Sequence, residues 1–254
     1  MNVKLACSLA ATLGAALIGS AAAAQGLPAN APAGACLPYG TPAERDARLH
    51  TDWAWMARYK ADDQALAASG QPVDVVFMGD SITEGWYCRV PAYFRPGLVG
   101  RGIGGQTTPQ MVVRFRQDVL DLKPKAVHIM MGTNDIAANT GPMTVEQTEA
   151  NFKTLTELAQ AHGIKVILAS IPPSAGFPWA PTVATVDKIR TLNAWIKAYA
   201  ASVGAVYADY TSVLDNGQGG MKPGISIDGV HPNPDGYALM RPVADAAIAT
   251  ALGK

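Results

Sequence analysis

Short apolar runs alternate with amphipathic stretches through most of the chain, and this pattern limits the possible folds more than any other feature. The runs are four to six residues long and continuous rather than alternating, as expected of strands that are buried on both faces. The stretches between them have the period of helices, so the sequence predicts βαβ units around a parallel sheet. The predicted strands are residues 73–78, 98–103, 126–131, 165–169 and 205–208.

Capping residues mark where several of the intervening helices begin. Thr108 precedes a proline, and Asn233 does the same ahead of the last predicted helix, which Pro242 is expected to kink or restart. One helix is expected from Pro42 to about Ala68. Another carries apolar residues at helical spacing over residues 186–199, which predicts a face packed on the core.

Length and composition are those of a single globular domain. The chain has 254 residues, of which 49% are hydrophobic, enough for one sizeable core, and we place this domain at residues 71–254. Lys plus Arg and Asp plus Glu both number 20, and no basic run is interleaved with aromatics. Nucleic acid is therefore not an expected partner.

The N-terminus has the order of a secretory signal peptide. Lys4 is followed by an apolar stretch over residues 5–18 and by small residues that end at Ala24, so cleavage is predicted after Ala24. A membrane anchor is the alternative, but the apolar stretch is short and no stop-transfer charges follow it. We expect export to the periplasm or the exterior, no stable membrane insertion after cleavage, and an N-terminal extension with a helix over residues 25–70.

Cleavage there leaves two cysteines, Cys36 and Cys88, in the mature chain. An exported protein meets conditions in which a disulfide persists, so a bridge between them is predicted. The alternative is a pair of buried free thiols.

The end of the first predicted strand carries a candidate nucleophile. In an open parallel sheet the ligand crevice lies at the carboxyl ends of the strands, and this strand ends in Gly79-Asp80-Ser81. A serine that starts the next helix lies near backbone N–H groups and the positive end of the helix dipole, which favours developing negative charge. Taken alone, the tripeptide is equally typical of a turn and helix cap.

The next two strands end in groups that can donate hydrogen bonds. Gly105 lies in a glycine-rich turn that lets its backbone N–H approach a substrate oxygen, and no lysine stands where a phosphate-binding loop needs one. Asn134 follows the third strand and offers a side-chain amide to an oxyanion. A turn stabilised by Asn and Asp side chains is the alternative for this segment.

Near the C-terminus, Asp228 precedes His231 by three residues. A tight turn there brings the carboxylate onto one imidazole nitrogen and leaves the other free. The remaining histidines have no acidic neighbour at such a spacing, and no His or Cys pair has the spacing of metal ligands. We therefore expect neither a metal nor another cofactor.

With these four blocks in this order, over about residues 73–240, the sequence resembles the SGNH hydrolases, also called GDSL-type esterases and lipases. The stretch after the first strand resembles the branch of platelet-activating-factor acetylhydrolase-like and lysophospholipase-like enzymes. The resemblance implies an α/β fold, a flavodoxin-like three-layer α/β/α sandwich with a five-stranded parallel sheet. It implies Ser81 as nucleophile, His231 as base and Asp228 as its partner, with Ser81, Gly105 and Asn134 as oxyanion donors.

The implied activity is hydrolysis of carboxylic esters through an acyl-enzyme by a secreted protein that needs no cofactor. We expect short-acyl, acetyl-type substrates, either small acyl esters or acetylated carbohydrates. The alternatives are a lysophospholipase or arylesterase, an acyltransferase to saccharide hydroxyls, and a non-catalytic carbohydrate-binding protein. The sequence leaves the oligomeric state open.

Aromatic residues near the expected site are candidates for substrate binding. Trp86 follows the nucleophile, and Phe177 and Trp179 lie in a proline-rich segment after the fourth strand. Walls of this kind suit a sugar face, an aryl ester or an acyl chain, and core packing is the alternative for each residue.

Overall fold

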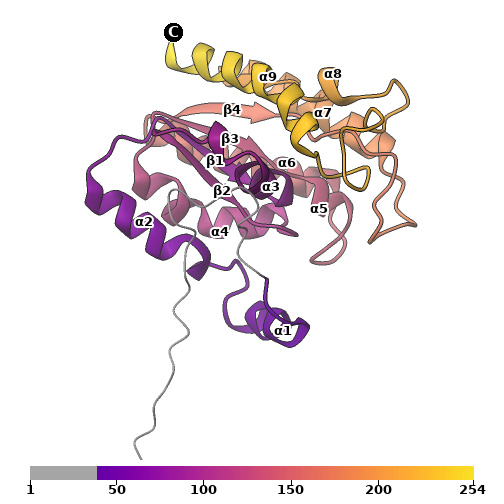
Figure 1. Ribbon diagram of the computed structural model, residues 1–254, viewed down its shortest axis with the longest axis horizontal. Coiled ribbons are helices and arrows are strands. Elements are labelled where there is room, and N and C mark those ends of the chain that lie inside the picture. Colours follow the sequence, from indigo (N-terminus) through magenta and orange to yellow (C-terminus); the bar gives the residue numbers. More distant parts are fainter. Residues whose placement is uncertain (1–38) are drawn as a thin grey trace, which may run out of the picture.

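The computed structural model describes residues 39–254, and it has the predicted three-layer architecture (Figure 1). Five parallel strands form one sheet in the order β2-β1-β3-β4-β5, with helices on both faces. This is the flavodoxin-like order, in which the connections diverge beside β1 and open a crevice at the carboxyl ends of β1 and β3. The strands are β1 (Val75–Gly79), β2 (Leu98–Gly102), β3 (Ala126–Met130), β4 (Lys165–Ala169) and β5 (Val206–Ala208).

The nine α-helices of the described chain include two short ones of four residues, α5 after β3 and α8 after β5. The helices are α1 (Pro42–Thr51), α2 (Ala57–Ser69), α3 (Ser81–Arg89), α4 (Thr108–Asp118), α5 (Thr133–Ile136), α6 (Val145–Ala161), α7 (Val186–Ser202), α8 (Thr211–Leu214) and α9 (Pro234–Leu252). Short 3₁₀ turns lie at Pro91–Tyr93 and Leu120–Leu122.

Alternate side chains of each strand supply two hydrophobic cores, one on each face of the sheet. In β1, Val76 and Met78 pack with apolar residues of α4, α6 and α7, whereas Val75 and Phe77 pack with those of α3 and α9. All four side chains are fully buried, as continuous apolar strands require. Figure 1 shows α9 along one side of the sheet and α2 and α4 along the other.

The prediction of a single helix over residues 42–68 is wrong, because the structure has two helices there, α1 and α2, with a break that begins at Asp52. The Asp52 carboxylate accepts hydrogen bonds from the backbone N–H groups of Met56 (2.7 Å) and Ala57 (2.9 Å). It satisfies donors at the start of α2 in the way that a capping side chain does. Trp55, with a φ of 51°, lies in the turn between the two helices. Helix α1 buries no residue and projects from the rest of the domain (Figure 1).

Two smaller expectations about helix ends also differ from the structure. The cap of α4 is Thr107 rather than Thr108, because Thr107 and Gln110 form a reciprocal capping box. Asn233 caps α9 as predicted, since its Oδ1 accepts from the N–H groups of the first turn. Pro242, however, does not restart that helix, which is continuous over 19 residues, and the alternative of a kink there stays a prediction.

Several expectations concern residues outside the described part of the chain. These are the signal peptide at residues 1–24, the first part of the extension, and Cys36. Cys88 is buried and disulfide-bonded, and its pairing with Cys36 stays a prediction. From residue 39 onward, none of the helices combines the length and the apolar character needed to cross a bilayer.

Candidate active site

Ser81 is the first residue of α3, directly beyond the carboxyl end of β1. Asp80 caps the helix, and its Oδ1 accepts from the backbone N–H of Ile82 at 2.9 Å. The N–H of Ser81 belongs to the first turn, where backbone donors have no acceptor within the helix. Residue 79 is glycine because its neighbours pack against it closely: a Cβ there would meet Thr83 Oγ1 at 2.1 Å and the Met130 carbonyl oxygen at 2.6 Å.

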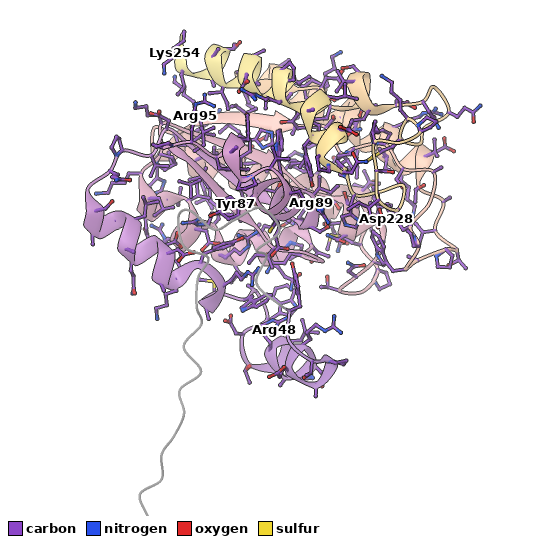
Figure 2. All side chains as sticks on the ribbon, viewed as in Figure 1. Arg48, Tyr87, Arg89, Arg95, Asp228 and Lys254 are labelled. Carbon is purple, nitrogen blue, oxygen red and sulfur yellow. The ribbon has the colours of Figure 1, made fainter. Side chains whose placement is uncertain are left out.

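His231 and Asp228 lie in the loop before α9, and Figure 2 labels Asp228 there. Gly229 has a φ of 83°, which turns the chain so that Asp228 Oδ1 accepts from the N–H groups of Val230 (3.0 Å) and His231 (2.9 Å). The Asn233 Nδ2 donates to the Gly224 carbonyl at 2.8 Å and ties this loop to the start of α9. The loop is therefore built around the carboxylate.

The structure brings Ser81, His231 and Asp228 together in one line of hydrogen bonds. Ser81 Oγ lies 2.9 Å from His231 Nε2, and His231 Nδ1 lies 2.8 Å from Asp228 Oδ2. Burial pushes the pKa of Asp228 upward, but hydrogen bonds from His231 and Val230 outweigh it, so this pKa lies below its ordinary value. An ionised Asp228 fixes the proton of the imidazole on Nδ1 and leaves Nε2 free to accept the hydroxyl proton.

Gly105 lies in the exposed turn between β2 and α4, with a φ of 76° that favours glycine. Its backbone N–H donates to no acceptor within the described residues. The neighbouring N–H of Gly104 donates to the carboxylate of Glu84 at 3.0 Å and to the Tyr39 hydroxyl. Glu84 itself is buried and pairs with Arg58 of α2, so the N-terminal extension helps to hold this turn.

Asn134 lies in α5, beyond the end of β3, and is only 2% exposed. Its Nδ2 donates to the Gln106 carbonyl at 3.0 Å and faces Asp80 Oδ2 at 3.4 Å. The second contact is longer than an ordinary hydrogen bond, so one N–H of the amide is weakly held. The structure therefore places the amide beside the Ser81 turn, with Gln106 and Asp80 as its present partners.

The aspartates of the two turns have different surroundings. Burial raises the pKa of Asp80 to about 6, against the hydrogen bond from Ile82 that lowers it. Asp135 accepts mainly from Thr108 (N–H, 3.0 Å) and Thr148 (Oγ1, 3.3 Å). It thus fastens α5 to the starts of α4 and α6, and burial raises its pKa as well.

A buried arginine that sequence reasoning missed supports the ends of β1 and β2. Arg114 of α4 is fully buried, donates to the carbonyl oxygens of Gly79 and Arg101 at 2.9 Å each, and pairs with Asp118 at 2.7 Å. Its Nε donates to Gln106 Oε1 at 2.6 Å. The sequence did hold a signal for this arginine: a charged residue lies on the apolar face of a predicted helix, and an Asp follows it four residues later.

The three aromatic candidates lie in different surroundings. Trp86 is 1% exposed and stacks between Tyr93 and Tyr237 in the core, so it presents no ring face to a ligand. Phe177 is also 1% exposed and stacks on Trp179 at 5.2 Å. Trp179 alone of the three is open to solvent, at 43%, and its ring lies 5.8 Å from that of His231.

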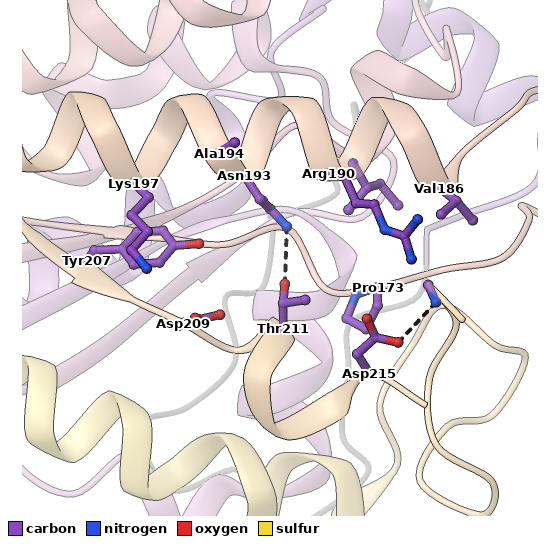
Figure 3. Close-up of a pocket in the computed structure, with 12 residues that line it drawn as sticks. Pro173, Val186, Arg190, Asn193, Ala194, Lys197, Tyr207, Asp209, Thr211 and Asp215 are labelled. Carbon is purple, nitrogen blue, oxygen red and sulfur yellow. Dashed lines mark hydrogen bonds between the residues drawn. The ribbon is translucent and has the colours of Figure 1, made fainter. Parts of the chain in front are cut away.

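A separate cavity of about 210 Å³ lies between α7 and the segment that follows β5 (Figure 3). Arg190, Lys197, Tyr207, Asp209 and Asp215 are among its lining residues. None of the predicted site residues lines this cavity. The described residues contain no group of three or more side chains that are arranged to hold a metal ion.

Comparisons with known proteins agree with this architecture. The model of the GDSL-like lipase/acylhydrolase family matches residues 77–239. A GDSL-like lipase structure from Bacteroides thetaiotaomicron is 41% identical with a TM-score of 0.75, and the match covers 79% of this chain and all of that one. Esterase TesA of Pseudomonas aeruginosa is 28% identical over 184 residues, 68% of this chain and 82% of TesA. The lipoprotein YqeF of Bacillus subtilis is 37% identical over 118 residues, 39% of this chain and about half (49%) of YqeF.

Proposed function

The chain belongs to the GDSL-like lipase/acylhydrolase family, a family of carboxylic ester hydrolases, and we propose that it is an exported serine esterase that acts on short-acyl esters through an acyl-enzyme. One observation carries this proposal: the unbroken line of hydrogen bonds from Ser81 Oγ through His231 to Asp228. Such a line suits acyl transfer because it combines a nucleophile, a base and a group that orients the base.

In the proposed reaction, Ser81 Oγ attacks the carbonyl carbon of the ester while its proton passes to His231 Nε2. The tetrahedral intermediate collapses when the C–O bond to the alcohol breaks, and His231 returns the proton to the departing alkoxide. Water then attacks the acyl-serine with His231 as base, releases the carboxylic acid and restores Ser81. Asp228 stays ionised throughout, in keeping with its lowered pKa, and stabilises the imidazolium.

Three donors are proposed for the oxyanion: the backbone N–H groups of Ser81 and Gly105 and the Asn134 amide. The two backbone groups need no rearrangement, because one lies in the first turn of α3 and the other has no acceptor within the described residues. For Asn134, the N–H that faces Asp80 across 3.4 Å would turn to the oxyanion. Preorganised donors of this kind are a large source of rate acceleration.

The exposed ring of Trp179 favours an acetylated carbohydrate as the substrate class. A flat aromatic face beside His231 fits the apolar face of a sugar, whose acetyl group would then reach Ser81. Phe177, stacked under Trp179, keeps that face turned outward. We do not extend this role to Trp86, since its burial in the core removes it from the crevice.

Export is proposed on the N-terminal sequence, and the relative YqeF, named as a lipoprotein, supports it. The domain at residues 71–254 would follow the signal peptide and the extension. Expression of the full chain with its own N-terminus tests both points. A product that starts at Gln25 and lies outside the cytoplasm supports export, and an uncleaved cytoplasmic product contradicts it.

The nucleophile is tested with a fluorophosphonate probe, which forms a stable adduct with activated serines. We expect the wild type to be labelled at Ser81 and to hydrolyse p-nitrophenyl acetate, and we expect Ser81→Ala to lose both properties while its melting temperature is maintained. Ser212→Ala serves as the control, because the Ser212 hydroxyl donates to the Asp209 carbonyl oxygen and takes no part in the relay. Labelling or full hydrolysis by Ser81→Ala would point to a different nucleophile.

Substrate class is tested with nitrophenyl esters of rising chain length beside acetylated xylan and other acetylated glycans. Highest kcat/KM on acetyl esters, with release of acetate from the glycans, supports the proposal. Preference for long chains favours a lysophospholipase, and a preference for aryl acetates over glycans favours an arylesterase. Transfer of acetyl to an added saccharide faster than to water favours an acyltransferase, and no reaction with any substrate or probe favours a binding protein.

A further inference from the structure

Asn139, in the loop after α5, contacts three parts of the site that belong to different segments. Its Nδ2 donates to Asn134 Oδ1 at 2.8 Å and to the Gly105 carbonyl oxygen at 3.2 Å, and its Oδ1 accepts from Trp179 Nε1 at 3.1 Å. One exposed carboxamide is thus bonded to both proposed oxyanion residues outside α3 and to the aromatic ring beside His231. Its place in the sequence points to no role.

The direction of these hydrogen bonds is fixed by the groups at their ends. The indole N–H of Trp179 can only donate, so the Asn139 atom that faces it is the oxygen. The carbonyl of Gly105 can only accept, so the Asn139 atom that faces it is the nitrogen. Because Asn139 Nδ2 is a donor, the Asn134 atom that faces it is the oxygen. Asn134 Nδ2 therefore faces the carbonyl of Gln106, which can only accept. No other assignment of the two amides satisfies all the partners.

We infer that Asn139 is a positioning residue for the oxyanion donors, an inference that rests on the proposed function. It holds the Asn134 carboxamide with Nδ2 directed to the Ser81 side, and it holds the Gly105 peptide in place. If the Asn134 amide turned over, its oxygen would occupy the position of a donor and would repel the oxyanion. By fixing one orientation in advance, Asn139 removes the cost of reorganising the donors during the reaction.

Loop architecture keeps Asn139 in reach of these partners. Its backbone N–H donates to the Asn134 carbonyl oxygen at 3.0 Å, and Ala138 before it has a φ of 57°. Thr140 Oγ1 lies 2.9 Å from Thr107 Oγ1 and ties the loop to the start of α4. These contacts anchor the loop without Asn139's side chain, so a change of that side chain acts on the donors rather than on the fold.

A double-mutant cycle between Asn139 and Asn134 tests the inference. In the wild type, Asn139→Leu, which keeps the bulk and removes the polar atoms, should lower kcat for p-nitrophenyl acetate about tenfold, within the range of coupling seen inside one hydrogen-bond network. The KM should change less than kcat. In the Asn134→Ala background the same change should have less than about a twofold further effect, because the group through which it acts is gone.

Thr140→Val is the matched control, since it removes a hydrogen bond from the same loop and leaves Asn134 and Gly105 untouched. It should keep kcat within about twofold of the wild type. Trp179→Phe is the second variant: it keeps a ring, removes the terminal donor, and should give a smaller loss of kcat than Asn139→Leu.

The outcomes separate this inference from the proposed function. A wild type that is labelled at Ser81 by the fluorophosphonate, with Asn139→Leu at full kcat, overturns the inference alone. The inference is also overturned if Asn139→Leu lowers kcat by the same factor in the wild type and in Asn134→Ala. It is overturned as well if Thr140→Val lowers kcat as much as Asn139→Leu does. A wild type without labelling or hydrolysis overturns the proposed function, and the inference with it.

Discussion

At the scale of single residues, Asn134, which we propose as an oxyanion donor, can be changed while the Ser81–His231–Asp228 relay is left intact. We predict that Asn134→Ala lowers kcat by about a hundredfold to a thousandfold, the loss typical of one oxyanion donor. KM should change much less, because the donor acts mainly on the charge of the transition state. Steady-state kinetics on p-nitrophenyl acetate measure both constants. Wild-type turnover in this variant would make Asn134 a turn residue.

The position of a residue was predictable from sequence where its near neighbours point to one role, and it was not predictable where the role depends on residues distant in sequence. His231 stood out because Asp228 is three residues away, and the structure brings the two side chains to within 2.8 Å. Trp86 could line a crevice or fill a core, and the choice depends on neighbours from α9 that are distant in sequence. Asn139 gave no local signal, because its partners come from three separate segments.

At the scale of elements, the contact between α2 and α3 rests on a buried ion pair. Arg58 Nη2 bonds to the Glu84 carboxylate, and the two side chains are 2% and 8% exposed. We predict that Arg58→Met alone lowers the free energy of unfolding by about 3–5 kcal/mol, because Glu84 is left buried without its counter-charge. The double variant Arg58→Met/Glu84→Gln should recover most of the loss, since Gln can still accept from Gly104. Urea unfolding measures both, and equal losses in the two variants would contradict the prediction.

The strand β3 carries a histidine whose burial makes stability sensitive to acid. His128 is fully buried, and burial lowers its pKa from 6.5 to about 3, while its Nε2 lies 2.7 Å from the Tyr210 hydroxyl. In the unfolded chain it binds a proton below pH 6.5. The folded state does not do so until about pH 3, so this group's contribution to stability is complete above pH 6.5 and is lost progressively between those values.

We therefore compare the wild type with His128→Gln, which keeps a hydrogen-bonding group for Tyr210 and does not titrate. The difference in the free energy of unfolding, wild type minus variant, should fall by about 1.4 kcal/mol for each pH unit below the ordinary histidine pKa. Urea unfolding at a series of pH values measures this slope. Parallel profiles for the two proteins would show that His128 does not titrate differently on folding.

Element types were predictable because burial on both faces leaves a continuous apolar run, and all five strands lie within two residues of their predicted bounds. Helix ends were less predictable, since they depend on which side chain reaches the backbone. Asp52 separates α1 from α2 by capping two N–H groups, and Thr107 takes the cap of α4 because Gln110 is three residues away. Each of these choices depends on a competition between neighbouring polar side chains.

At the scale of the whole molecule, the order of the strands explains why the site residues meet. The blocks at Ser81, Gly105 and Asn134 follow β1, β2 and β3, which are neighbours in the sheet, so their ends converge at one edge. The extension from Tyr39 to Ser69 adds a second support, because α2 packs against α4 and the Tyr39 hydroxyl accepts from the N–H of Gly104, beside Gly105. The sequence predicted a helix there but not that it would hold the turn.

The two cores share the same strands, so we predict that they unfold together. Ile196 of α7 is fully buried on one face of the sheet, and α9 packs on the other. Ile196→Ala should lower the free energy of unfolding by about 2–5 kcal/mol. If unfolding is cooperative, the slowest-exchanging amides of α9 should exchange faster by the same factor as those of α7, although no contact of α9 has changed.

Hydrogen exchange followed by mass spectrometry measures both helices in one experiment. Val113→Ala is the control, since Val113 is 52% exposed and its truncation should change stability by less than about 0.5 kcal/mol. Faster exchange confined to α7 and its neighbours on the same face would mean that each layer opens alone. The proposed site needs both layers folded, because Ser81 begins α3 on one face of the sheet. On the other face, α4 and the hydrogen bond from Asn139 to Asn134 support the groups that we propose as oxyanion donors.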